Sequence, residues 1–148
     1  MITELLMDNF YFSDRQLSWQ EAICLAANPL LNKGAITQNY INDVIKNIEI
    51  NGSYIVLVPE IALPHARSNG NVLQTAMSFL KLTHPVTFPD GMSVTVMFFL
   101  ASTDSDGHLD VLVELAEILA DKNNQNLFRT AKKQEQILAI LNQPKQIA

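Results

Sequence analysis

The stretch that decides the fold is the run Val94-Thr95-Val96-Met97-Phe98-Phe99-Leu100. Its apolar residues follow one another almost without interruption, yet the run is far shorter than the ~20 residues that a membrane-spanning helix needs. Near-continuous apolar strands are typical of central strands that are covered on both faces. We therefore predict a sheet that has its centre at residues 94–100 and carries helices on both sides.

Other strands are predicted upstream of this run. The segment Tyr54-Ile55-Val56-Leu57-Val58 is short and rich in β-branched residues, as strands are. A further strand is expected from Leu73 to Leu82, between the turn residues Asn69-Gly70-Asn71 and Pro85. The aromatic run Phe10-Tyr11-Phe12 is a candidate edge strand.

Helical patterns come before these strands. Ser18 followed three residues later by Glu21 has the spacing of a capping box, in which each residue bonds to the other's backbone N–H. Because Pro29 has no backbone N–H, we expect this first helix to kink or end near Asn28. A second helix is predicted from about residue 37 to residue 49.

Helical patterns also follow the strands. The last helix is expected from about Gln134. A longer one is expected after the segment 104–107, with a buried stripe made of Leu109, Leu112, Val113, Ala116 and Leu119. Helices, then strands, then helices predict one α/β domain over residues 1–148, a layered sandwich with a mixed sheet flanked by helices on both faces.

Composition narrows the class of partner. The chain has 10 Lys plus Arg against 15 Asp plus Glu, a net charge of −5, which disfavours a nucleic-acid partner. A single cysteine, Cys24, excludes an internal disulfide, and its place in an amphipathic helix predicts that it packs rather than reacts. The N-terminal segment lacks the basic start of a signal peptide, so we expect a cytoplasmic protein without membrane insertion.

His65 is the first candidate for chemistry. It lies in the string Leu63-Pro64-His65-Ala66-Arg67, in which the proline restricts the backbone just before the imidazole. Imidazole serves as base, nucleophile or metal ligand near neutral pH. Arg67 is a permanent cation with the fork geometry that suits phosphate. The competing interpretation is a turn histidine without a chemical role.

The other two histidines of the chain are His108 and His84. His108 is expected at the start of a helix, where backbone N–H groups and the helix dipole favour an anion, or where it is a solvated residue. His84, before Pro85, is expected at the surface. A metal site that combines His65 and His108 with nearby carboxylates is disfavoured, because no paired-ligand spacing occurs and the acids are better explained as helix-start residues.

The ordered set of motifs resembles a known family. The box Ile61-Ala62-Leu63-Pro64-His65-Ala66-Arg67 is similar to the active-site box of EIIA domains of the bacterial sugar phosphotransferase system, fructose–mannitol superfamily (EIIA type 2). The resemblance also includes residues 19–22 in the first helix, residues 85–88 after the second strand, and His108 at the start of a long helix. It covers nearly the whole chain.

The resemblance implies a phosphoryl relay without a cofactor or metal. His65 would accept phosphate from the phosphocarrier protein HPr and pass it to a cysteine of the matching EIIB, which serves the membrane component EIIC. His108 would be the second histidine of the active centre, and Arg67 a cation for the phosphate. A homodimer is left open.

One departure from the family pattern bears on the carbohydrate. Mannitol- and fructose-type members usually carry an Arg-Glu pair before the box, whereas residues 45–49 contain no arginine. Residues 52–59 instead resemble the ascorbate-type branch, which favours L-ascorbate, with galactitol-like or other pentitol substrates open. Arg67 or Lys46 would replace the missing cation. A regulatory protein phosphorylated on His65 and a metal-dependent hydrolase are the alternative functions.

Overall fold

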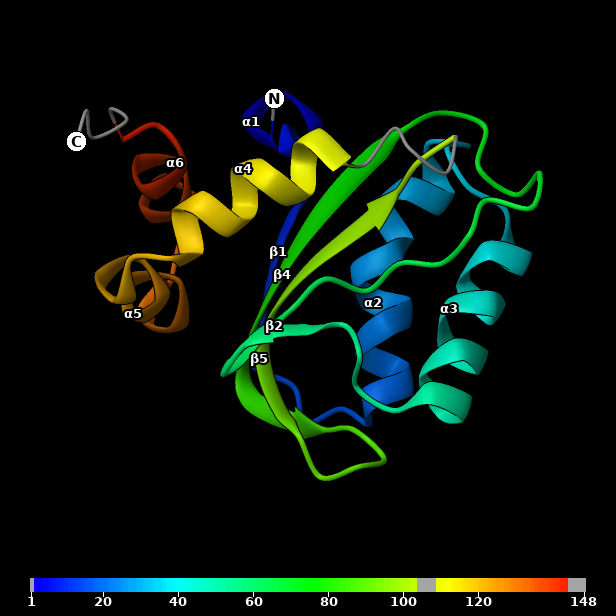
Figure 1. Ribbon diagram of the computed structural model, residues 1–148, viewed down its shortest axis with the longest axis horizontal. Coiled ribbons are helices and arrows are strands. Elements are labelled where there is room, and N and C mark those ends of the chain that lie inside the picture. The colour runs from blue at the N-terminus through cyan, green and yellow to red at the C-terminus, as the bar shows by residue number, and fades with distance from the viewer. Residues whose placement is uncertain (1, 104–108, 144–148) are drawn as a thin grey trace.

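A mixed five-stranded sheet forms the centre of the molecule in the computed structural model, which describes residues 2–103 and 109–143 (Figure 1). The strand order is β1-β4-β5-β3-β2. The pairs β1–β4 and β3–β5 are parallel, and the pairs β4–β5 and β2–β3 are antiparallel. The strands are β1 (Phe10–Ser13), β2 (Val56–Val58), β3 (Glu60–Ala62), β4 (Ala76–Thr87) and β5 (Ser93–Ala101).

The predicted central strand is confirmed. β5 lies between β4 and β3, and its residues from Val94 to Ala101 are all buried. The edge strand at Phe10-Tyr11-Phe12 is confirmed as β1. The three-residue β3, which precedes the Pro64 box, was not predicted as a separate strand.

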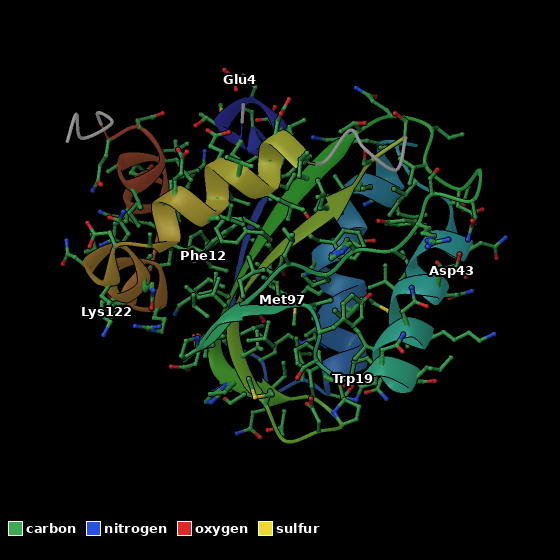
Figure 2. The ribbon with its side chains drawn as sticks, in the orientation of Figure 1. Glu4, Phe12, Trp19, Asp43, Met97 and Lys122 are labelled. Atoms are coloured by element: carbon green, nitrogen blue, oxygen red, sulfur yellow. The ribbon has the colours of Figure 1, made fainter. Side chains whose placement is uncertain are left out.

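Helices cover both faces of the sheet, which confirms the predicted fold class (Figure 1). One face carries α2 (Trp19–Asn32) and α3 (Gln38–Asn51), and the other carries α1 (Ile2–Leu6), α4 (Leu109–Leu119), α5 (Lys122–Thr130) and α6 (Gln134–Leu141). Figure 2 shows Met97 on the side of α2 and Phe12 on the side of α4. Met97 belongs to the apolar cluster that includes residues of α2 and α3, and Phe12 packs against the cluster that includes residues of the other four helices.

The first long helix starts as predicted but does not stop where predicted. The capping box is present, since the Glu21 N–H donates to Ser18 Oγ and the Ser18 N–H donates to Glu21 Oε1. An end of the helix near Asn28 is wrong, because α2 passes Pro29 and ends at Asn32. Packing overrides the proline, since buried residues on both sides of it hold the helix against the sheet: Ala26, Ala27 and Leu30.

The helix closes one turn later through Gly34, which has a φ of +75°. The Gly34 N–H donates to the Leu31 carbonyl and the Ala35 N–H to the Leu30 carbonyl, the paired bonds of a Schellman motif. The cysteine prediction is also corrected, because Cys24 is exposed on α2.

The second predicted strand was placed too early and ended too soon. β4 runs from Ala76 through Pro85 to Thr87. Lys81 faces Val96 across the ladder and Val86 faces Val94, so five steps along β4 oppose two steps along β5. Pro85 lies inside this bulge, where its missing N–H removes no ladder hydrogen bond.

The C-terminal helices confirm the predicted elements but correct one buried face. α4 buries Val111, Leu115 and Leu119, whereas Leu109 and Val113 are exposed, so most of the expected stripe was wrong. The last helix begins at Gln134 as predicted. The short helices α1 and α5 were not predicted.

Candidate functional site

His65 lies just beyond the carboxyl end of β3, beside the end of the central strand β5. The chain leaves β3 at Ala62. The Leu63 N–H then donates to the Ile55 carbonyl at 2.8 Å, and the Leu100 N–H donates to the Pro64 carbonyl at 3.0 Å. Leu63 and Pro64 are buried, and His65 is half-buried. The predicted rigid Pro-His box is therefore a segment tied into the sheet on both sides.

The orientation of the His65 ring is set by a bond to its own backbone segment. Nδ1 lies 2.7 Å from the carbonyl oxygen of Leu63. Because a carbonyl only accepts hydrogen bonds, Nδ1 carries the ring proton in this contact. In the neutral imidazole the lone pair then resides on Nε2, which is the nitrogen that is able to act as a nucleophile.

Two tyrosines that the sequence analysis missed also touch the box. The Tyr54 hydroxyl donates to the His65 carbonyl at 2.9 Å, and its ring meets the imidazole edge-on with centroids 5.8 Å apart. The Tyr40 hydroxyl accepts from the Ala66 N–H at 3.1 Å. Burial raises the pKa of Tyr40 to about 12 and raises the pKa of Tyr54, so both phenols keep their protons near neutral pH.

The other predicted site residues are His108, Arg67 and the alternative cation Lys46. His108, with the neighbouring acids Asp104 and Asp106, lies outside the described residues. α4 begins at Leu109, directly after His108 in the sequence. Arg67 is exposed. Lys46, the other cation considered, is exposed on α3.

His84 does not take part in this site. It is exposed on β4, as predicted. It lies between the bulge residues Lys81 and Val86, away from the box at the end of β3.

No metal-binding group of three or more His, Cys, Asp or Glu side chains occurs within residues 2–103 and 109–143. Nucleophilic attack by an imidazole needs positioned donors and cations, and no metal.

The family resemblance implies phosphoryl transfer to His65, and we expect that dialysis against a strong chelator leaves the rate of this transfer unchanged. Separately prepared phospho-HPr is the donor, so that metal dependence of earlier steps does not enter. A rate that collapsed and was restored by zinc would instead support the hydrolase alternative.

In the described part of the chain, no helix combines the length and the apolar character needed to cross a membrane.

Comparison with known proteins gives a consistent family. Residues 4–143 match the family model "Phosphoenolpyruvate-dependent sugar phosphotransferase system, EIIA 2". The mannitol-specific cryptic phosphotransferase enzyme IIA component of Escherichia coli K12 is 31% identical, over 89% of this chain and 95% of the relative. Its solution structure superposes with a TM-score of 0.85 at 29% identity, over 95% of this chain and 97% of that chain.

Two further relatives differ in their roles. The ascorbate-specific EIIA component of Escherichia coli K12 is 24% identical over 84% of this chain and 83% of the relative. The crystal structure of the nitrogen regulatory protein IIA-Ntr from Neisseria meningitidis is 27% identical, with a TM-score of 0.77, over 95% of this chain and 99% of that chain. Because the family model spans nearly the whole chain, this protein belongs to the EIIA type-2 family of the phosphoenolpyruvate-dependent sugar phosphotransferase system.

Proposed function

We propose that this protein is a phosphoryl relay that accepts a phosphoryl group on Nε2 of His65 from phospho-HPr and passes it to a cysteine of its cognate EIIB. The observation that carries the assignment of the atom is the 2.7 Å contact between His65 Nδ1 and the Leu63 carbonyl. It supports an imidazole whose lone pair is on Nε2. Family membership supports the direction of the relay.

The two transfer steps are simple exchanges of one bond for another. The Nε2 lone pair attacks phosphorus, the Nε2–P bond forms, and the P–N bond to HPr breaks. The ring then carries positive charge, and the Nδ1–H bond to Leu63 strengthens as it does so. In the second step the EIIB thiolate attacks phosphorus, the P–S bond forms and the Nε2–P bond breaks. The electron pair of the broken bond returns to Nε2, so that His65 is neutral again. The protein's task is to position groups and stabilise negative charge.

His108 and Arg67 are proposed to contact the phosphoryl group without carrying it. The start of α4 at Leu109 supports this role for His108, because helix N-termini favour anions. We expect His108→Gln, which keeps a donor but cannot become cationic, to accept phosphate from HPr and pass it to EIIB slowly. His108→Ala should be slower, since removing one such donor costs ~10²–10³ in rate.

Single-turnover transfer from each phosphorylated variant to EIIB measures this effect of His108. If both variants run at the wild-type rate, His108 is a solvated helix-start residue.

The carbohydrate is tested through EIIB. The relatives point two ways, since the mannitol-type relative is more identical than the ascorbate-type one. The identity of 31% to the mannitol-type relative, against 24% to the ascorbate-type one, does not favour L-ascorbate over mannitol as the carbohydrate. The decisive experiment combines phosphoenolpyruvate, enzyme I, HPr and this protein with a panel of mannitol-, ascorbate- and galactitol-type EIIB proteins. Rapid transfer to one member identifies the carbohydrate class, and phosphorylation without transfer to any member contradicts the transport role.

A regulatory role is the second candidate, supported by the similarity to the nitrogen regulatory IIA-Ntr protein. In that case phosphorylation of His65 would change the binding of a partner protein. The same panel separates the two roles. A relay discharges to one EIIB within the turnover time of HPr, whereas a regulator keeps its phosphoryl group in the presence of every EIIB.

A further inference from the structure

The peptide group that joins His65 to Ala66 is held on both of its polar atoms by tyrosine hydroxyls. Its carbonyl, from His65, accepts a hydrogen bond from the Tyr54 hydroxyl at 2.9 Å. Its N–H, from Ala66, donates to the Tyr40 hydroxyl at 3.1 Å. The plane of this peptide group is therefore fixed from two sides.

Tyr40 connects this peptide group to the sheet. It lies on α3 and is fully buried, with its ring edge-on to Phe99 at 5.9 Å between centroids. Its hydroxyl lies 2.7 Å from the Leu100 carbonyl and 3.2 Å from the Ala66 carbonyl. A hydroxyl has one proton, and the shorter contact directs it to Leu100. Tyr40 thus links helix α3, the end of β5 and the residue after His65.

Tyr54 connects the same peptide group to the surface. The Asn47 side chain on α3 lies near the phenol, where it lowers the pKa of Tyr54 by hydrogen bonding against the larger opposite effect of burial. The preceding residue, Ser53, donates its N–H and its hydroxyl to the Asp90 carboxylate in the β4–β5 hairpin. The ring itself lies edge-on to the imidazole. The residue before Tyr54 is therefore fixed to the hairpin, and Tyr54 itself touches both the backbone and the ring of His65.

We propose that Tyr40 and Tyr54 are positioning residues for phosphoryl transfer, and that they act by clamping the His65–Ala66 peptide group. The proposal rests on the proposed function of His65. Fixing this peptide plane fixes the direction in which the side chain leaves the backbone, and the Tyr54 ring limits rotation of the imidazole. The bond from Nδ1 to the Leu63 carbonyl then fixes the remaining rotation of the imidazole ring, so that Nε2 points in one direction. Pre-alignment of this kind lowers the barrier because the reacting atom is already in place.

The clamp has a consequence for the phosphoryl group. The Ala66 N–H is a backbone donor next to the phosphoacceptor, and it is committed to Tyr40. Stabilisation of the phosphoryl oxygens is thereby left to other donors, which agrees with the roles proposed for His108 and Arg67.

The test uses hydroxyl deletions with a matched control. The chain has 3 tyrosines, and Tyr11 on β1 has the same exposed fraction as Tyr54, 44%, but does not touch the box. We expect Tyr54→Phe to lower the maximal rate of transfer from phospho-HPr about tenfold and Tyr40→Phe up to about 10²-fold, as small misplacements of reacting groups do. The phospho-HPr concentration at half-maximal rate should not change. Tyr11→Phe should behave as wild type.

Three readouts separate positioning from loss of structure. Urea unfolding should show that Tyr54→Phe loses at most the stability of one hydrogen bond relative to Tyr11→Phe and is fully folded under the assay conditions. Imidazole ¹⁵N spectra should show the Nδ1–H tautomer in the wild type and a loss of that preference in the slow variants. Tyr54→Leu, which also lacks the ring, should be slower than Tyr54→Phe. If Tyr40→Phe fails to fold, the two Tyr54 variants still test the proposal.

The outcomes also separate this proposal from the proposed function. The end point should remain one phosphoryl group per chain on His65 in every folded variant. If the wild type takes no phosphate, or takes it elsewhere, the proposed function fails. If His65 is phosphorylated but Tyr54→Phe runs at the wild-type rate, or changes only the half-maximal concentration, the clamp is overturned.

Discussion

Replacing His65 by alanine is expected to abolish phosphorylation of this protein and all transfer to EIIB. The expectation follows from the geometry of the box, in which Leu63 orders the ring through Nδ1 and leaves the lone pair on Nε2. The loss should be complete rather than graded, because alanine has no atom that can form the bond to phosphorus. Incubation with phosphoenolpyruvate, enzyme I and HPr, followed by intact mass measurement, checks the result. The wild type should gain the mass of one phosphoryl group in acid-labile form.

His84→Ala is the matched control, since His84 is an exposed histidine on β4 outside the box. It should be phosphorylated like the wild type. A labelled His65→Ala protein would contradict the assignment, and a phosphoryl group on Nδ1 of the wild type would contradict the assigned tautomer. ³¹P and ¹⁵N spectra of the phosphorylated protein distinguish the two nitrogens.

The predictable part of the fold was the part with an unambiguous hydrophobic pattern. The apolar side chains from Val94 to Leu100 leave water only if both faces of the strand are covered, and this run is the central strand β5. The capping box at Ser18 was legible because both partners lie within one turn. Such signals are local, so one sequence suffices to read them.

The wrong predictions came from local rules that tertiary packing overrode. Pro29 removes one helical hydrogen bond, but the apolar residues on either side of it are buried against the sheet. Pro85 would break a regular ladder, but β4 bulges there. Both outcomes depend on packing or pairing with other elements, which the local pattern does not contain.

The buried face of α4 was misassigned for a different reason. The helix is apolar on more than one side, so periodicity alone does not select the face. Val111 and Leu115 face the core, while Leu109 and Val113 remain exposed. The opposite problem hid α5, whose sequence is mainly polar and buries only Asn124 and Phe128.

The candidate site was predictable in its reactive residue and not in its support. His65 could be singled out because a proline precedes it and few other chemical groups compete. The Tyr40 hydroxyl accepts a hydrogen bond from the Ala66 N–H, and the two residues are 26 positions apart in the sequence. The sequence pattern predicts Tyr54 as the first residue of a strand, whereas β2 begins two residues later, at Val56. The one signal for Tyr54 in the sequence is its polar hydroxyl beside a segment rich in β-branched residues.

The second large effect concerns stability. Phe98 is fully buried at the centre of β5, on the face covered by α1, α4, α5 and α6. Its ring meets that of Phe79 at 5.2 Å and that of Phe128 at 5.4 Å, both edge-on. It therefore joins two neighbouring strands to helix α5. Removing the ring leaves a cavity between elements that are each held in place by other contacts, so the site cannot collapse fully.

We expect Phe98→Ala to lower the free energy of unfolding by ~3–5 kcal/mol, as phenylalanine truncations in cores do. Domains have total stabilities of about 5–15 kcal/mol, so the variant should still fold at low temperature and unfold at a clearly lower urea concentration.

Leu127→Ala is the control, because Leu127 lies on the same helix as Phe128 but is 40% exposed. Its effect should be within about 0.5 kcal/mol. A loss of less than about 1 kcal/mol for Phe98→Ala would mean that the aromatic cluster is not the tie between the sheet and α5. Because Phe98 and His65 lie on different elements, the folded fraction of the variant should still accept phosphate on His65, which distinguishes a stability defect from a defect in the relay.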